Sequence, residues 1–209
     1  EIAAKRLGAD VINMNIEGSS LRKGESLHDT AQTLGAMNPD LVVIRHGVDD
    51  ASKKIAEIVS CPVINAGEGI NEHPTQALLD AYTIINNKRN LENITVSICG
   101  DLEHSRVARS NYYLLKKMKS NVRFVYPEFF KPKDLDKYEV ETFTSLEEGI
   151  TDADIVMMLR IQNERISDMK LPSKESYFEQ FGLTYKKLKL AKPEVLVLHP
   201  GPINRNVEI

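Results

Sequence analysis

Residues 94–106 read Ile94-Thr95-Val96-Ser97-Ile98-Cys99-Gly100-Asp101-Leu102-Glu103-His104-Ser105-Arg106. The stretch starts with an apolar run rich in Ile and Val, continues through a glycine and polar residues, and enters a helical pattern at Ser105. A buried strand that leads through a short polar turn into a helix is typical of the parallel sheets of α/β proteins. This stretch therefore predicts a strand, a turn and a helix, with polar side chains at the carboxyl end of the strand.

The same pattern recurs along the chain. Further apolar runs lie at residues 11–16, 41–44, 63–65, 122–126, 155–159 and 195–198. Helical patterns lie at residues 26–37, 51–59, 74–87 and 105–118. Ser26 and Asp29 fit a capping box at the start of the first of these helices. Alternating strands and helices at this spacing predict an α/β fold with parallel sheets and right-handed crossovers.

Two domains are expected, because residues 86–93 form a polar, turn-prone stretch. The first domain would cover residues 1–88 with three visible strands, and the second residues 89–209 with about four. The helix at residues 74–87 is expected to link them. Residues 162–192 are polar with broken helical periodicity, which predicts an irregular loop region, and such loops are often functional.

Composition excludes several classes of protein. Hydrophobic residues make up 42% and charged residues 27% of the 209, as in ordinary globular domains. The formal net charge of -3 argues against a nucleic-acid or anionic-membrane partner, which needs a basic surface. No apolar run approaches the roughly 20 residues that span a bilayer. Cys61 and Cys99 fit neither a disulfide framework nor metal spacing, so a reducing, cytoplasmic location is expected.

Polar and cationic side chains follow nearly every predicted strand. The segments are residues 17–25, 45–47, 66–76, 100–106, 160–165 and 199–205. In open α/β sheets, ligands bind beyond the carboxyl ends of the strands. Arginine suits both phosphate and carboxylate groups through its planar guanidinium. The sequence therefore predicts a cationic site for anionic substrates at this edge.

Most single residues in these segments have two interpretations. Pro74 fits the first position of a helix, so His73 either donates to a carbonyl oxygen that gains charge or only caps the helix. Arg45 is either an anion ligand or a member of a salt bridge at the end of its strand. Ser20 and Lys23 lie in a glycine-flanked loop that is either functional or merely solvated.

The remaining segments are equally open. Asp101 and Arg106 bracket a turn that lacks the glycine pattern of a dinucleotide fingerprint. Residues 160–165 either clamp a carboxylate or form an ordinary loop face. Residues 199–202 are either a rigid turn or present backbone carbonyls to an amide donor. The two other histidines lack a second ligand at metal spacing and are interpreted as structural; they are His28 and His46.

Taken in order, these motifs resemble the catalytic chain of the aspartate carbamoyltransferase family, over essentially the whole sequence. The motifs are Ser20-Leu21-Arg22-Lys23-Gly24-Glu25, Arg45-His46, His73-Pro74-Thr75-Gln76, Gly100-Asp101 with His104-Ser105-Arg106, Arg160-Ile161-Gln162 with Glu164-Arg165, and His199-Pro200-Gly201-Pro202 with Arg205. Any one of them is weakly specific, whereas the ordered set is highly specific. The resemblance implies two doubly wound parallel-sheet domains of the transcarbamylase type, linked by a long helix.

The resemblance also implies site residues. The catalytic residues would be His73, Arg45 and Lys23. The carbamoyl phosphate ligands would be Arg45, His73, Gln76, Ser20, Lys23, Gly201 and Pro202, with Ser20 and Lys23 reaching into the site of a neighbouring subunit. The aspartate ligands would be Arg106, Arg160 and Gln162. Neither a metal nor a cofactor is implied. The expected partners are two further copies in a homotrimer, and regulatory or other pyrimidine-pathway chains.

Two departures from the family pattern stand out. The family's Ser-Thr-Arg-Thr phosphate segment would precede Glu1, and its last helix would follow Ile209, so the sequence is interpreted as a fragment of a longer chain. The longer chain is expected to be active, and the activity of the fragment is left open. The sequence leaves three alternatives. An ornithine-specific relative typically has His-Cys-Leu-Pro where this chain has residues 199–202. A non-catalytic homologue is disfavoured by Lys23, Arg45, His73 and Arg160, and a nucleotide-binding protein by the missing glycine fingerprint.

Overall fold

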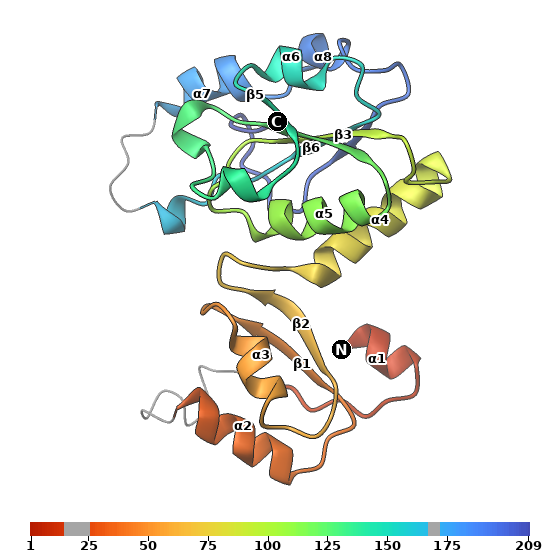
Figure 1. Cartoon of the computed structure of the whole chain (residues 1–209), viewed down its shortest axis with the longest axis vertical. Coiled ribbons are helices and arrows are strands. Elements are labelled where there is room, and N and C mark those ends of the chain that lie inside the picture. The colour runs from red at the N-terminus through yellow and green to blue at the C-terminus, as the bar shows by residue number, and fades with distance from the viewer. Residues whose placement is uncertain (15–25, 167–171) are drawn as a thin grey trace. The chain divides into compact units, whose positions relative to one another are not determined.

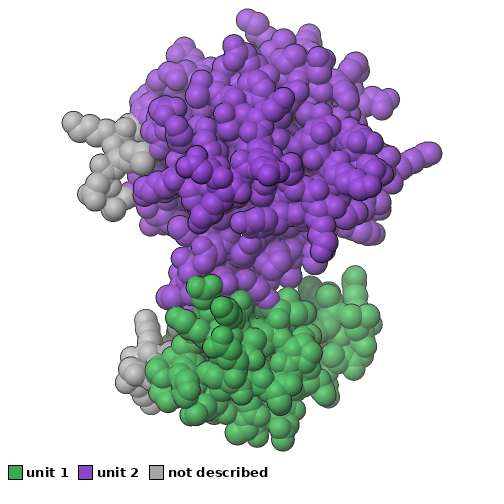
Figure 2. Space-filling view, viewed as in Figure 1, with its two compact units in different colours: residues 1–44, 50–64 green, residues 45–49, 65–209 purple. Residues whose placement is uncertain are grey.

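The computed structural model describes residues 1–14, 26–166 and 172–209 (Figure 1). The chain divides into two compact units, which Figure 2 shows in different colours. Unit 1 consists of Glu1–Ile44 and Asp50–Ile64, and unit 2 of Arg45–Asp49 and Asn65–Ile209. In the described residues, no helix has the length and apolar character needed to cross a membrane.

Unit 1 is a small α/β unit. Its elements are α1 (Ile2–Arg6), α2 (Leu27–Ala36), α3 (Ala51–Ala56) and the first residues of β1 (Val42–His46) and β2 (Val63–Glu68). The predicted capping box is confirmed: Ser26 Oγ accepts the N–H of Asp29 at 3.1 Å, and the Asp29 carboxylate accepts the N–H of Ser26 at 3.3 Å. The core of this unit is formed by Ala31, Ile55 and Val59.

The strand expected at residues 11–16 is wrong for residues 11–14, and residues 15 and 16 lie outside the described part of the chain. Ile12 is 86% exposed and Met14 52% exposed. A strand needs a neighbour to satisfy its backbone N–H and C=O groups. Among the described residues, β1 and β2 form a sheet of two strands only, so this segment has no such neighbour.

β1 and β2 run in the same direction. Val42 N–H donates to Pro62 O at 3.0 Å, and Gly69 N–H donates to His46 O at 3.1 Å, so the paired positions rise together along both strands. The last residues of both strands belong to unit 2. The carboxyl ends of β1 and β2 therefore deliver Arg45 and the segment 65–73 to that unit.

Unit 2 is built on a five-stranded parallel sheet. Its strands are β3 (Thr95–Cys99), β4 (Asn121–Val125), β5 (Glu141–Phe143), β6 (Ile155–Met158) and β7 (Leu196–Leu198), in the spatial order β5-β4-β3-β6-β7. All four neighbouring pairs are parallel. β5 was not predicted, because a three-residue edge strand with two exposed residues carries almost no apolar pattern.

Helices cover both faces of this sheet. They are α4 (Pro74–Lys88), α5 (Arg106–Lys117), α6 (Leu146–Ile150), α7 (Lys174–Phe181), α8 (Tyr185–Leu188) and the 3-10 turns η3 (Glu128–Phe130), η4 (Leu135–Lys137) and η5 (Asn163–Arg165). Figure 1 shows α4 and α5 on one side of the strands and α6 and α8 on the other. The irregular region predicted at residues 162–192 is partly wrong, since it contains α7 and α8. These helices begin after the N-caps Ser173 and Thr184, which are not distinctive within a polar stretch of sequence.

The central strands are buried on both faces, which explains their continuous apolar runs. Val96, Ile98, Ile155 and Met157 are all 0% exposed. The chain leaves β3 in one direction to form β4 and β5, and returns on the other side of β3 to form β6 and β7. The carboxyl ends of β3 and β6 thus flank a topological switch point, where such sheets bind ligands. The predicted α/β, doubly wound fold is confirmed.

Candidate active site

Three elements of unit 2 meet at Gly67, near the end of β2. The backbone of Gly67 has a φ of +112°, and a Cβ built there would lie 3.0 Å from His73 Cδ2 and 3.2 Å from Arg106 Cζ. His73 precedes α4, and Arg106 is the first residue of α5. The absence of a side chain at position 67 therefore lets an imidazole and a guanidinium approach the same point.

The side chain of His73 is available for chemistry. His73 occupies the N-cap position of α4, as predicted, but its side chain makes no capping hydrogen bond, so the imidazole does not cap the helix. Its backbone N–H donates to Ser110 Oγ at 2.8 Å, and its Nδ1 lies 3.2 Å from Thr75 Oγ1. Burial, together with the positive charges of Arg106 and Arg45, lowers the pKa of His73 to about 4. The imidazole is consequently neutral at pH 7.

Three arginines give this region a positive field. Arg106 donates to Gly69 O at 3.3 Å, and Arg165 donates to His104 O at 2.8 Å. Burial, and then the charges of Arg45 and Arg165, lower the pKa of Arg106. Among the residues that the structure describes, no carboxylate forms an ion pair with any of the three. A bound anion would relieve their mutual repulsion.

Asp49 fixes the loop that follows β2. Its Oδ1 accepts the N–H groups of Ile70 at 2.8 Å and Asn71 at 3.2 Å. Glu68 N–H donates to Glu72 O at 3.0 Å and closes the same loop from the other side. The loop after β1 and the loop after β2 are therefore tied together, which places Arg45 beside the segment that carries His73.

Buried polar pairs join α4 to α5. Ser110 Oγ donates to the Glu72 carboxylate and accepts the His73 N–H. Further along, Gln76 Nε2 donates to Asp80 Oδ1 at 2.9 Å, and Asn111 Nδ2 donates to Asp80 Oδ2 at 2.8 Å. Burial raises the pKa of Asp80. In this structure the amide of Gln76 is thus engaged with its own helix.

Asp101 connects the ends of β3 and β6 at the switch point. It is 0% exposed, and its Oδ1 lies 2.8 Å from His104 Nδ1. Its Oδ2 accepts the N–H of Gln162 at 3.0 Å. Burial raises the pKa of Asp101 despite these donors. This carboxylate therefore holds the loop after β6 against the loop after β3.

Arg160 is engaged within its own loop. Its guanidinium forms an ion pair with Glu164 and donates to Gln162 Oε1 at 3.0 Å. The hydrogen bond to Glu164 raises the pKa of Arg160. Burial lowers the pKa of Arg165, the Glu164 carboxylate opposes this shift, and the charge of Arg160 adds to it. The charge of Arg165 in turn lowers the pKa of Arg106, after burial and the charge of Arg45. Arg165 therefore interacts electrostatically with both predicted aspartate-binding arginines.

The turn at residues 199–205 is closed by a local hydrogen bond. Gly201 and Pro202 are exposed and joined by a cis peptide bond, and Gly201 N–H donates to His199 Nδ1 at 2.9 Å. Among the described residues, no hydrogen bond joins Gly201 or Pro202 to Arg45 or His73. The assignment of Gly201 and Pro202 to the carbamoyl phosphate site therefore stays a prediction.

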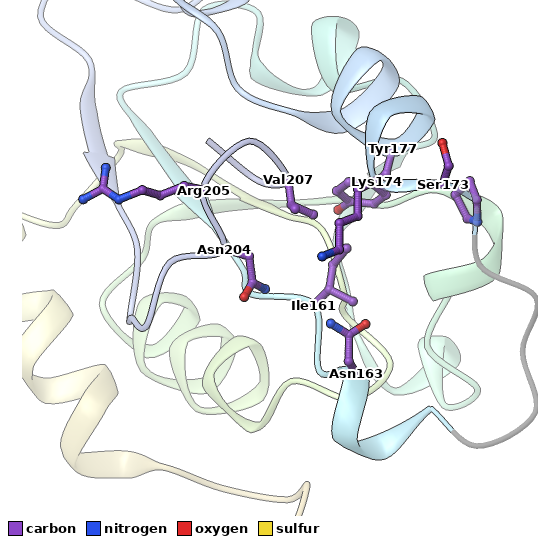
Figure 3. A pocket seen from close by; sticks show the side chains of 9 residues that line it. Ile161, Asn163, Ser173, Lys174, Tyr177, Asn204, Arg205 and Val207 are labelled. Carbon is purple, nitrogen blue, oxygen red and sulfur yellow. The ribbon is translucent and has the colours of Figure 1, made fainter.

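A cavity of about 500 Å³ opens beside the loop after β6 (Figure 3). Ile161 and Asn163 line it from that loop, and Lys174 and Tyr177 from α7. Asn204, Arg205 and Val207 belong to the chain's last segment and complete the wall shown in Figure 3, with the Arg205 guanidinium turned away from the other side chains. The cavity is therefore bounded by the segments that follow β6 and β7.

Some site residues cannot be placed, and others were missed. Ser20 and Lys23 lie outside the described residues. Sequence reasoning did not single out Gly67, whose only signal is a glycine within the polar segment after a strand, or Ser110, a serine inside a helix. No group of three or more potential metal ligands was found within residues 1–14, 26–166 and 172–209.

Two family profiles match almost the whole chain. Residues 1–86 match the carbamoyl-P binding domain of aspartate/ornithine carbamoyltransferases, and residues 92–209 match their Asp/Orn binding domain. The chain therefore belongs to the aspartate/ornithine carbamoyltransferase family.

Named relatives lie on the aspartate side of this family. The aspartate carbamoyltransferase catalytic subunit of Pelagibacter ubique is 53% identical over 209 residues, which are 100% of this chain and 67% of that protein. The subunit of the same name from Brucella anthropi is 55% identical, with 100% of this chain and 65% of that protein covered. The chain thus spans about two thirds of the length of these relatives.

Solved structures agree on the fold. Aspartate transcarbamoylase from Trypanosoma cruzi, in complex with carbamoyl aspartate and phosphate, superposes with a TM-score of 0.84 at 31% identity, covering 98% of this chain and 66% of that one. Ornithine carbamoyltransferase from Pyrococcus furiosus has the same TM-score of 0.84 at 24% identity, covering 100% of this chain and 68% of that one, and at that identity it supports the fold alone.

Proposed function

We propose that the protein transfers the carbamoyl group of carbamoyl phosphate to the α-amine of L-aspartate, giving N-carbamoyl-L-aspartate and phosphate in pyrimidine biosynthesis. The observation that carries this proposal is the gathering of His73 and Arg106 against Gly67, with Arg45 and Arg165 adding positive charge. Two anionic substrates need such a field. The names of the relatives, and the T. cruzi complex with carbamoyl aspartate and phosphate, support the choice of substrates.

The two substrates divide the site between them. Carbamoyl phosphate binds to Arg45, His73 and Gln76 in a domain of residues 1–88, and aspartate binds to Arg106, Arg160 and Gln162 in a domain of residues 89–209. Support comes from the separate family matches to a carbamoyl-P domain and an Asp/Orn domain. Arg160 exchanges its present partners, Glu164 and Gln162, for an aspartate carboxylate.

Catalysis relies on position and charge. The neutral α-amine of aspartate attacks the carbonyl carbon, and the new C–N bond forms. The bond from that carbon to the phosphate oxygen breaks, and the amine gives up a proton to the departing phosphate. Thr75 Oγ1 lies 3.2 Å from His73 Nδ1. We assign the proton of the neutral ring to Nε2, so that Nδ1 accepts from Thr75 and Nε2 donates to the carbonyl oxygen as negative charge develops there. Arg45 stabilises the departing phosphate. Orientation of two bound substrates supplies much of the rate enhancement.

The assembly extends beyond one chain. Ser20 and Lys23 reach the site of a neighbouring subunit in a homotrimer, and Lys23 adds a third catalytic side chain there. Gly201 and Pro202 present their backbone to the carbamoyl amide once substrate is bound. Regulatory or other pyrimidine-pathway chains bind the trimer. A cytoplasmic location is part of the proposal, and the free thiols of Cys61 and Cys99 are compatible with a reducing compartment.

A bisubstrate analogue tests this proposal by binding alone. N-(phosphonacetyl)-L-aspartic acid is bound by the T. cruzi enzyme. In the complete natural protein that contains this chain, calorimetry should show one site per chain for this compound. The matched compound with L-ornithine in place of aspartate should bind at least about a hundredfold more weakly, because it leaves a carboxylate-binding arginine unpaired. Equal affinity for both compounds would contradict aspartate as the acceptor.

A further inference from the structure

Glu208 is a buried carboxylate that the proposed mechanism does not use. It is 0% exposed and lies in the last segment of the chain, after β7. A buried charge is costly unless it is well hydrogen-bonded. The groups that satisfy it therefore show what the residue does.

Three N–H donors converge on the two oxygens of Glu208. Ile161 N–H donates to Oε1 at 2.8 Å, and Asn204 Nδ2 donates to the same oxygen at 2.7 Å. The backbone N–H of Asn204 donates to Oε2 at 2.9 Å. One carboxylate thereby joins the loop after β6 to the turn after β7.

The first of these donors lies inside the proposed aspartate site. Ile161 stands between Arg160 and Gln162, whose side chains are proposed to bind aspartate. The next N–H along the chain, that of Gln162, is held by Asp101 at 3.0 Å. Two successive N–H groups are thus fixed by two fully buried carboxylates, Glu208 from the β7 side and Asp101 from the β3 side.

The other end of the connection is the turn that carries Gly201 and Pro202. Ile161 and Asn204 face the same cavity of about 500 Å³ from these two segments (Figure 3). Leu183 N–H also donates to Glu208 O at 2.8 Å, which anchors the backbone of Glu208 just after α7. Glu208 therefore has a fixed position from which to hold both segments.

We propose that Glu208 is a positioning residue that sets the aspartate-binding geometry of Arg160 and Gln162 by holding Ile161 N–H, and that couples this loop to the turn at residues 199–205. The proposal rests on the proposed function, because it assigns the loop to aspartate. Glu208 acts through the backbone and touches neither substrate.

The sharpest test is Glu208→Gln in the complete natural protein. The shape is kept, but one oxygen becomes an NH₂ group that must face an N–H donor in either orientation. We expect the KM for aspartate to rise at least about tenfold, as for a displaced binding group. The KM for carbamoyl phosphate should rise clearly less, because its proposed side-chain ligands Arg45, His73 and Gln76 lie on other segments and only the backbone of Gly201 and Pro202 lies on the coupled turn. An unchanged KM for aspartate, or equal rises for both substrates, would overturn the proposal.

A matched control and a local readout complete the experiment. Glu179→Gln removes one carboxylate from the exposed side of α7 and should change neither KM. Hydrogen exchange should accelerate at residues 161–162 and 199–205 in Glu208→Gln; unchanged exchange there would also overturn the proposal. If Glu208→Gln does not fold, Asn204→Ala removes one donor and should raise the KM for aspartate about two- to fivefold, and more than the KM for carbamoyl phosphate. An unchanged KM for aspartate in Asn204→Ala would then contradict the proposal.

The proposed function can fail separately. A wild-type protein that forms no aspartate-dependent product contradicts the assignment of the substrate, while hydrogen exchange still decides whether Glu208 holds Ile161 and Asn204.

Discussion

Gly67 packs directly against His73: a Cβ on residue 67 would lie 3.0 Å from His73 Cδ2. That distance is shorter than a van der Waals contact, and the φ of +112° at Gly67 is one that residues with a side chain rarely adopt. Gly67→Ala should therefore push the imidazole aside and strain the backbone. We expect a loss of about 1–3 kcal/mol in the free energy of unfolding and a large loss of carbamoyl transfer.

Gly47→Ala is the matched control for this substitution. Gly47 follows β1 in the same unit, and a Cβ there would meet no atom within 4 Å. Urea unfolding and turnover should be nearly unchanged by Gly47→Ala. Wild-type stability and turnover in Gly67→Ala would show that the close approach of these two residues has no importance.

The ionisation of His73 should be visible in both titration and stability. Its pKa is lowered to about 4 from an ordinary 6.5, by burial and by Arg106 and Arg45. Between these two values the unfolded chain binds the proton more readily than the folded one. His73 therefore lowers the stability of the protein as the pH falls from 6.5 towards 4, and has no such effect above 6.5.

NMR titration of labelled imidazole groups measures this pKa directly. The His73 resonances should shift only below pH 5, with carbamoyl transfer showing no step from His73 around neutrality. A midpoint near 6.5 would contradict a buried, neutral ring in a positive field.

Arg160→Ala separates the two proposed substrate sites. The substitution removes a cation from the loop after β6, so the KM for aspartate should rise about tenfold to hundredfold, the value of a charged hydrogen bond. Binding of carbamoyl phosphate, measured by calorimetry without aspartate, should be almost unchanged. Arg123→Ala removes an arginine that is ion-paired with Glu141 at 3.2 Å and serves as the control. Equal damage to the two substrates in Arg160→Ala would contradict the division of the site.

The N-cap of α5 should affect both stability and aspartate use. Ser105 Oγ accepts the N–H of Ala108 at 3.2 Å and holds the first turn of the helix that begins with Arg106. Ser105→Ala should cost about 1 kcal/mol and raise the KM for aspartate. Ser145→Ala removes the equivalent cap of α6, where Oγ accepts Glu148 N–H at 3.3 Å, and should cost stability without changing that KM. Identical kinetics of the two variants would argue that the start of α5 does not position Arg106.

The sequence predicted the central strands because their burial leaves an unmistakable pattern. β3 and β6 lie in the middle of the sheet and are apolar throughout, so their ends, and the residues that follow them, were located correctly. The edge strand β5 was missed, since two of its three residues are exposed. At residues 11–14 a strand was predicted wrongly. The apolar run there indicates a strand, but a strand also needs a neighbouring strand to pair with.

The candidate site was predictable where side chains carry charge. Arg45, His73 and Arg106 were expected at strand ends; the structure brings His73 and Arg106 against Gly67, and the charge of Arg45 acts on both. Glu208 was not singled out, and Asp101 was noted only as one end of a turn, because the role of a buried carboxylate depends on which backbone N–H groups the fold brings to it. Gly67 was not recognised either, because its importance lies in the His73 and Arg106 side chains that occupy the space where its own side chain would be.

The acceptor of the carbamoyl group is the most direct test of the central claim. Carbamoyl phosphate labelled with ¹⁴C in its carbamoyl carbon is incubated with the complete natural protein and L-aspartate, L-ornithine or no acceptor, and the products are separated. We predict labelled N-carbamoyl-L-aspartate in the reaction with aspartate. The reaction with ornithine should give no more labelled product than the reaction without acceptor. Label in a carbamoylated ornithine, or no aspartate-dependent product at all, would contradict the account.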